Sequence, residues 1–312
     1  MKYLLVLFLL TGLLAGCSAT RTADLEERAQ ASDEQMLTMA GHYERAMELE
    51  KALIYYLKAL ENTPDDINLL YQIADLNKRL GKNDFALQML KRVLVLDPAH
   101  SKALTEAGLI FLENKQLTEA STHLLQATVE DQERLGNASS LSRHYVALDN
   151  DSPLLAYNGL AVTYDLMGKY EQAREVYALC LQSFPRNPVV LTNFGYSEYL
   201  SGNYEAAVQR FREAIDSTPA YKRAWTNLGL VYTRMGRYNK AYQTLNQVMS
   251  DAQAYNDLGY FLMLEKRYEE AEHFFERAIN LSPRFYEVAN ANLEDVRQQL
   301  ALMRDEAEFL SN

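Results

Sequence analysis

The chain has 312 residues, of which 48% are hydrophobic and 23% are charged, with 31 Lys and Arg against 42 Asp and Glu. This length allows a large buried core, and the low content of Gly and Pro excludes collagen-like and disordered chains. The net charge of −11 argues against nucleic-acid binding, because phosphates are neutralised by clustered Lys and Arg.

Residues 1–16 have the pattern of a secretory signal peptide. Lys2 forms a short positive region, and the apolar run from Tyr3 to Leu14 is too short to span a bilayer. The next residues, Leu-Ala-Gly before Cys17, resemble the lipobox of bacterial lipoproteins, in which the cysteine receives diacylglycerol and becomes the new N-terminus. The alternative is an ordinary signal peptide with an incidental cysteine.

The lipobox resemblance implies a location for the mature protein. Ser18 stands where an Asp is the usual inner-membrane retention signal, so we expect an outer-membrane lipoprotein that faces the periplasm. Each buried methylene contributes about 0.8 kcal/mol, so several acyl chains hold a protein durably. The N-acyl diacylglycerol at Cys17 is the only non-protein group expected, with no cofactor and no metal. Residues 17–32 read as the lipidated cysteine and a polar tether.

Prolines recur after the tether with a period of 34 residues. Pro64 and Pro98 are 34 apart, and so are Pro185 and Pro219. The longer spacings fit the same unit with one 19-residue insertion and one unit shortened by four residues. The predicted units are 33–66, 67–100, 101–134, 154–187, 188–221, 222–251 and 252–285.

The residues within each unit follow the tetratricopeptide-repeat (TPR) pattern W-x2-L-G-x2-Y, then A-x3-F, then P. The clearest example starts at Trp225, and apolar residues at i, i+3, i+4 and i+7 give each helix one apolar stripe. Gly or Ala at the eighth position of a unit allows the paired helix to approach closely. Turn glycines follow at Gly81, Gly168, Gly202 and Gly236, where a positive φ is easily adopted.

The sequence therefore predicts an all-α fold, a right-handed TPR solenoid of about seven helix-turn-helix repeats with a capping helix. Three repeats form an N-terminal block over 33–134, and four form a C-terminal block over 154–285. Residues 286–312 are the capping helix and tail. The inserted segment 135–153 is rich in Gly, Asn, Ser and Asp and is expected to be a loop. It is either a tolerated surface excursion or a contact loop or hinge between the blocks.

The sequence contains no catalytic constellation. The five histidines are scattered without the spacing of metal ligands, and no G-x-S-x-G or phosphate-binding glycine motif occurs. Cys180 is expected to be a small buried residue of a helix rather than a reactive thiol. We therefore expect a protein that is not an enzyme, has no small-molecule substrate and no nucleic-acid partner, and works by binding other proteins.

In a TPR solenoid the first helix of each unit lines a concave groove. Asn can donate and accept hydrogen bonds with an extended peptide, and Tyr adds apolar area with a polar tip. The alternative is that these asparagines bond within the scaffold. No lysine stands at the fifth positions, so no carboxylate clamp is predicted. The predicted partner-binding residues are Asn158, Val162, Asp165, Asn193, Tyr196, Tyr199, Asn227, Arg234, Asn256, Tyr260 and Met263.

Two stretches carry a narrower resemblance. One is DSPLLAYNGLAVTYDLMG from Asp151, with TNFGYSEYLSG from Thr192 one unit later, and the other is AYNDLGY from Ala254, with AINLSPRFY from Ala278 and NANL from Asn290. Together with the lipobox, they resemble the TadD-like TPR lipoproteins of the tight-adherence (Flp) pilus assembly system.

That resemblance implies an outer-membrane scaffold for Tad/Flp pilus assembly that assists localisation or multimerisation of the secretin. The secretin or other Tad pilus components would be its protein partners, and the lipid anchor would hold it at the membrane. Two alternatives remain: a pilotin of a type IV pilus or type II secretion system, and a general periplasmic adaptor for cell-wall enzymes.

Overall fold

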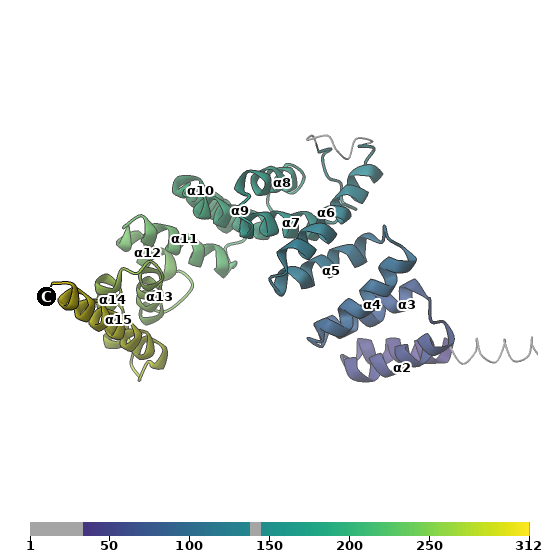
Figure 1. Ribbon diagram of the computed structural model, residues 1–312, viewed down its shortest axis with the longest axis horizontal. Helices are drawn as coiled ribbons and strands as arrows, with labels where there is room; N and C mark the ends of the chain where they lie inside the picture. The colour runs from purple at the N-terminus through teal and green to yellow at the C-terminus, as the bar shows by residue number, and fades with distance from the viewer. Residues whose placement is uncertain (1–33, 138–144, 312) are drawn as a thin grey trace, which may run out of the picture. The chain divides into compact units, whose positions relative to one another are not determined.

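The structure is a computed structural model that describes residues 34–137 and 145–311 (Figure 1). Within these ranges the regular structure is helical and contains no strand, which confirms the predicted all-α fold. The chain divides into two compact units, Met1–Glu130 and Asp131–Asn312. The predicted signal peptide, the predicted lipidation site Cys17 and the predicted tether lie outside the described residues.

The N-terminal unit consists of helix pairs that follow the predicted repeats. A helix over residues 34–45 precedes α2, and each later predicted repeat contributes one pair. The helices are α2 (Leu49–Asn62), α3 (Ile67–Arg79), α4 (Asn83–Leu96), α5 (Ser101–Glu113) and α6 (Leu117–Arg134), and the point of division falls within α6.

The C-terminal unit contains four further pairs and a final helix. The pairs are α7 (Leu154–Leu166) with α8 (Tyr170–Ser183), α9 (Pro188–Leu200) with α10 (Tyr204–Ser217), α11 (Lys222–Arg234) with α12 (Tyr238–Leu245), and α13 (Asp251–Leu264) with α14 (Tyr268–Leu281). The final helix is α15 (Glu287–Ser311). Each first helix packs on its own second helix and on the first helix of the next repeat.

The glycine at the eighth position of a repeat is required by close helix packing. A Cβ added to Gly195 would lie 2.8 Å from the ring of Phe211 on the paired helix. Gly108 is equally tight, with a distance of 2.5 Å from an added Cβ to Cγ of Leu124. The close approach predicted from the eighth position is therefore confirmed in both units.

The turn between the two helices of a repeat has a positive φ at the fifteenth position in all seven repeats. The sequence identified four of these positions because they carry glycine. The other three carry side chains. The residues with their φ values are Met47 (60°), Gly81 (72°), Lys115 (59°), Gly168 (73°), Gly202 (82°), Gly236 (69°) and Lys266 (60°).

The shortened repeat loses residues from the end of its second helix. Helix α12 has only 8 residues, whereas α8, α10 and α14 have 14 each. The next repeat starts at Ser250, which caps α13 in a capping box with Gln253. Helix α13 therefore begins at Asp251, one residue before the predicted unit boundary.

Helix α15 closes the C-terminal unit. Leu293, Val296 and Leu300 are buried against the last pair, whereas Val288 and Met303 are exposed. The exposed Glu294 and Asp295 stand in the part of the helix where the seven repeats carry Gly or Ala. Charged side chains here keep a further helix from packing closely, so α15 ends the array.

The described part of the insertion is bonded to the end of α6. The Gln132 side chain accepts a hydrogen bond from the Val146 backbone N–H at 2.7 Å and donates to the Val146 carbonyl at 3.1 Å. Arg134 forms an ion pair of 2.7 Å with Asp149, and Leu148 is buried. Residues 145–153 therefore pack within the C-terminal unit.

Candidate functional site

The predicted partner-binding residues differ widely in exposure. They lie on the first helices α7, α9, α11 and α13 of the C-terminal repeats. Tyr196, Arg234 and Tyr260 are exposed, Asn158, Val162, Tyr199, Asn227 and Met263 are half-buried, and Asp165, Asn193 and Asn256 are buried.

Two of the exposed members, Tyr196 and Arg234, belong to a tyrosine–arginine surface, which we define as Tyr196, Tyr199, Tyr204, Arg234 and Glu265. The rings of Tyr196 and Tyr199 stack with centroids 5.7 Å apart, and Tyr204 lies 5.9 Å beyond Tyr199. The Arg234 Nε donates to the Tyr204 hydroxyl at 3.1 Å. Adjacent aromatic faces beside a positioned guanidinium suit a peptide that carries both apolar and polar groups.

Glu265 holds the arginine of this surface in place. Its Oε2 lies 3.0 Å from Nη1 of Arg234 and 3.6 Å from Nη1 of Arg267. Its Oε1 is buried and has no hydrogen-bond partner among the described residues. Burial and the nearby Glu265 carboxylate both raise the pKa of Tyr199, so the tyrosine stays a neutral hydrogen-bond donor.

Two asparagine pairs lie inside the scaffold. Asn193 Nδ2 donates to Asn158 Oδ1 at 3.1 Å, and Asn292 Nδ2 donates to Asn256 Oδ1 at 3.1 Å. These four asparagines bond within the scaffold, as the alternative interpretation of the sequence stated. Asn227 differs, because no hydrogen bond of its side chain is found within the described residues and it is half-buried. Its amide can therefore pair with a partner.

The Asp165 side chain also forms its hydrogen bonds within the scaffold. Its carboxylate accepts hydrogen bonds from the Ser197 hydroxyl at 2.6 Å and the Tyr177 hydroxyl at 2.9 Å. Burial raises the pKa of Asp165 to about 6, and these two hydrogen bonds act in the opposite direction. Asp165 therefore joins α7, α8 and α9 and presents little surface to a partner.

Sequence reasoning missed Tyr204, Glu265 and Asn292. Tyr204 and Glu265 occupy the seventeenth and fourteenth positions of their repeats, outside the set assigned to the groove. Asn292 could have been found, because it is the sixth residue of α15, as Asn256 is of α13.

We also searched the part of the chain that the structure describes for metal sites, membrane-spanning helices and a reactive cysteine. No group of three or more His, Cys, Asp or Glu side chains is placed to hold a metal ion. No described helix is both long and apolar enough to cross a membrane. Cys180 is buried, as predicted, and burial raises the pKa of its thiol to about 12, so it stays protonated and poorly reactive near neutral pH.

Sequence comparisons match TPR models along most of the described chain. Residues 36–186 match the middle TPR-like domain of cilia and flagella-associated protein 70, residues 195–236 and 252–285 match TPR repeat models, and residues 224–253 match another. The general transcriptional corepressor ssn6 of Schizosaccharomyces pombe is 26% identical over 136 residues, which are 44% of this chain but only 11% of that protein.

Solved structures share the fold. A TPR protein from Parabacteroides merdae superposes with a TM-score of 0.63 at 16% identity and covers 86% of this chain and 99% of its own. PilW, described as a widely conserved type IV pilus biogenesis factor, gives 0.54 at 14% identity over 77% of this chain and 97% of its own. The structure of Pseudomonas aeruginosa pilF gives a TM-score of 0.53 at 18% identity, and the match covers 80% of this chain and 99% of that one.

The chain is therefore a TPR-repeat protein with an all-helical repeat fold. This fold is typical of protein-interaction scaffolds.

Proposed function

We propose that the protein is an outer-membrane lipoprotein that binds an extended segment of a pilus-assembly protein, the secretin in the first instance, in the Tad/Flp system. The observation that carries the binding role is the tyrosine–arginine surface, together with the half-buried Asn227 amide of α11. The pilus role is supported by the resemblance of the repeats and the lipobox to TadD-like proteins and by the fold shared with PilW.

Tyr196 of this surface, Tyr260 of α13 and Asn227 of α11 have different roles in the proposed binding. The exposed faces of Tyr196 and Tyr260 bury apolar side chains of the segment, and the Asn227 amide pairs with its backbone. Lipidation at Cys17 keeps the array at the membrane and raises its effective concentration towards a membrane-embedded partner.

The test of binding is a double variant, Tyr196→Ala with Asn227→Ala, studied in the full mature chain. We expect at least a tenfold loss of affinity for the purified secretin, about 1.4 kcal/mol or more, with little change in Tm because neither side chain is buried. The matched control is Tyr170→Ala with Asn280→Ala, which changes the same residue types on the second helices α8 and α14. Equal losses of affinity and Tm would assign Tyr196 and Asn227 to the scaffold.

The test of tethering is Cys17→Ser. The variant is expected to fold normally but to lose membrane attachment and pilus assembly, because the acyl chains supply the anchor. Circular dichroism, membrane fractionation and counting of pili by electron microscopy check the three outcomes. Normal piliation in a soluble variant would refute the tethering role.

The similarity to PilW favours one second candidate, a pilotin of a type IV pilus system. The gene neighbourhood separates the two. Genes for a Tad secretin and its pilus ATPase beside this gene support the first candidate, and genes for type IV pilins and their machinery support the second. Recovery of cell-wall hydrolases rather than a secretin after crosslinking in native envelopes would instead identify a general adaptor.

A further inference from the structure

An apolar hollow lies between the second helices of the first two repeats, in the N-terminal unit. Its volume is about 240 Å³. Leu57 of α2 stands on one side, Phe85 and Met89 of α4 stand on the other, and Ile73 of α3 contributes to the lining. Phe85 is 58% exposed and Leu57 is 43% exposed, so these apolar groups are available to another molecule.

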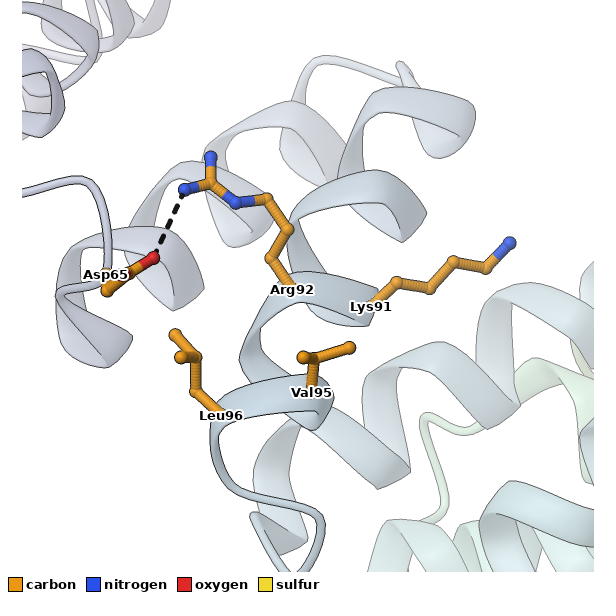
Figure 2. Close-up of a pocket in the computed structure, with 5 residues that line it drawn as sticks. All are labelled: Asp65, Lys91, Arg92, Val95 and Leu96. Atoms are coloured by element: carbon orange, nitrogen blue, oxygen red, sulfur yellow. Dashed lines mark ion pairs between the residues drawn. The ribbon is translucent and has the colours of Figure 1, made fainter.

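A second hollow of about 210 Å³ lies at the other end of α4. Figure 2 shows Arg92 reaching from α4 towards Asp65 in the loop between α2 and α3, with a distance of 3.9 Å between the charged atoms. Val95 and Leu96 complete its apolar side, and Val95 is 81% exposed.

The two hollows are joined by one stripe along α4. Phe85, Met89, Arg92 and Leu96 are spaced at i, i+4, i+7 and i+11, so they lie on one face of the helix. The stripe is about 16 Å long at about 1.5 Å per residue. A helix of three to four turns matches this length, and its apolar residues at i, i+3 or i+4 and i+7 would reach both hollows.

The repeat fold does not require apolar residues here. Phe85 stands at the nineteenth position of its repeat, and the four C-terminal repeats carry Gln172, Ala206, Lys240 and Glu270 at that position. All four of those repeats form the same helix pairs with polar or small residues outside. Pairing of the helices therefore does not require an apolar residue at the position of Phe85.

Two lysines without an ion pair among the described residues lie beside the stripe. Lys82 lines the first hollow and Lys91 lines the second, and neither forms an ion pair within the described residues. Lys82 is also the N-cap of α4, which receives no side-chain cap, so the positive end of the helix dipole adds to its charge. In Figure 2, Lys91 points away from Asp65 and is free to meet an acidic group.

We propose that the stripe on α4, with the two hollows at its ends, docks an amphipathic helix of a partner protein. The helix inserts an apolar face between α2 and α4 and places Asp or Glu side chains beside Lys82 and Lys91. Two hollows at the ends of one helix stripe receive a ridge of side chains, which distinguishes this occupant from a flat lipid surface. The proposal is independent of the proposed secretin-binding role, because the residues belong to a different unit and to the second helices.

The test is a selection from displayed random peptides of about 14 residues, about four helical turns, on the full mature protein. We expect enriched peptides with apolar residues at helical spacing and Asp or Glu beside them. Their affinity is expected to fall at least tenfold with Phe85→Gln and several-fold with Lys82→Glu. Replacing Glu by Lys in the peptide is expected to restore binding to Lys82→Glu. The control Lys240→Glu reverses a charge at the nineteenth position of a C-terminal repeat.

Several results would overturn the proposal. They are enriched peptides without helical spacing or acidic residues, enrichment that Phe85→Gln leaves unchanged, and no enrichment at all. Binding to phosphatidylethanolamine–phosphatidylglycerol vesicles that is lost in Phe85→Gln would assign the stripe to a lipid surface instead. A dimer that dissociates in Phe85→Gln, measured by analytical ultracentrifugation, would assign it to a second copy. Circular dichroism checks that every variant is folded.

Discussion

In the N-terminal unit the first helices pair charges with one another, whereas in the C-terminal unit they also expose tyrosine side chains. The Glu44 carboxylate accepts hydrogen bonds from Arg79 at 2.6 Å and from Gln72 at 2.8 Å, and Lys78 pairs with Glu106. The corresponding helices of the C-terminal unit expose Tyr196 and Tyr260.

Among the second helices, it is the N-terminal unit that exposes apolar side chains at these positions. Helices α2 and α4 expose Leu57, Phe85 and Val95, whereas the C-terminal repeats carry Gln, Ala, Lys and Glu where Phe85 stands. The helix pairs themselves are alike in both units. The repeat therefore specifies helix pairing, and the residues outside that pattern assign a different binding face to each unit.

The largest expected effect tests the close helix pairing that the two units share. Gly108→Ala and Gly195→Ala each place a methyl group against a packed side chain, Leu124 or Phe211. Each change is expected to lower the free energy of unfolding by about 1–3 kcal/mol, because overpacking forces the paired helices apart. Urea denaturation measures the loss.

The matched control is Ala161→Gly, at the eighth position of a repeat that already carries alanine. It creates no overlap and is expected to cost only about 1 kcal/mol through helix propensity. If Gly195→Ala were as stable as the wild type, close helix approach would not be what selects glycine in this unit.

The next effect contrasts two carboxylates at the twelfth position of their repeats. Asp165 is buried without an ion pair among the described residues, and its pKa is about 6, against about 3.9 in an unfolded chain. The folded state therefore binds more protons between about pH 4 and pH 6, and the contribution of this group to stability falls as pH rises through that range.

The substitution Asp165→Asn is expected to remove this fall, because the amide does not titrate. The difference in stability between the variant and the wild type should change by about 1 kcal/mol from pH 4 to pH 7, after allowance for partial solvent screening. Urea denaturation at several pH values measures it. A difference that is independent of pH would show that Asp165 keeps an ordinary pKa when folded.

Glu44, the twelfth residue of the first repeat, is expected to respond to salt. Its ion pair with Arg79 is partly exposed, so Glu44→Gln should cost about 1 kcal/mol at low ionic strength and less in high salt. Thermal unfolding at two salt concentrations checks the prediction. A cost that does not change with salt would assign the effect to the neutral hydrogen bonds of Glu44.

The smallest effect is stabilising. Lys115 has a φ of 59° at the fifteenth position, where four other repeats carry glycine. Lys115→Gly is expected to raise the free energy of unfolding by about 0.5–1 kcal/mol, because glycine adopts this conformation without steric cost. Lys102→Gly, within α5, is the control and is expected to destabilise the protein. A loss of stability in Lys115→Gly would show that its side chain contributes more than the strain costs.

The sequence by itself determined the helix pairs, the period, the shortened repeat and the close contacts at the eighth position. These features depend on apolar spacing within one 34-residue unit, so the local pattern contains them. The same reasoning could place Tyr196 of α9 and Tyr260 of α13 on the corresponding faces of their helices, because the direction of a side chain follows from its position in the helix.

Only the tertiary structure decided which polar side chains remain available to a partner. Asn193, Asn256 and Asp165 each pair with residues from a neighbouring helix, and the Arg234–Glu265 contact joins residues of two successive repeats. The bonding of Val146 to Gln132 likewise depends on where the insertion folds back. These partners lie 12 to 36 residues apart in the sequence, and a hydrogen bond between them depends on distances of a few tenths of an ångström that helical periodicity does not encode.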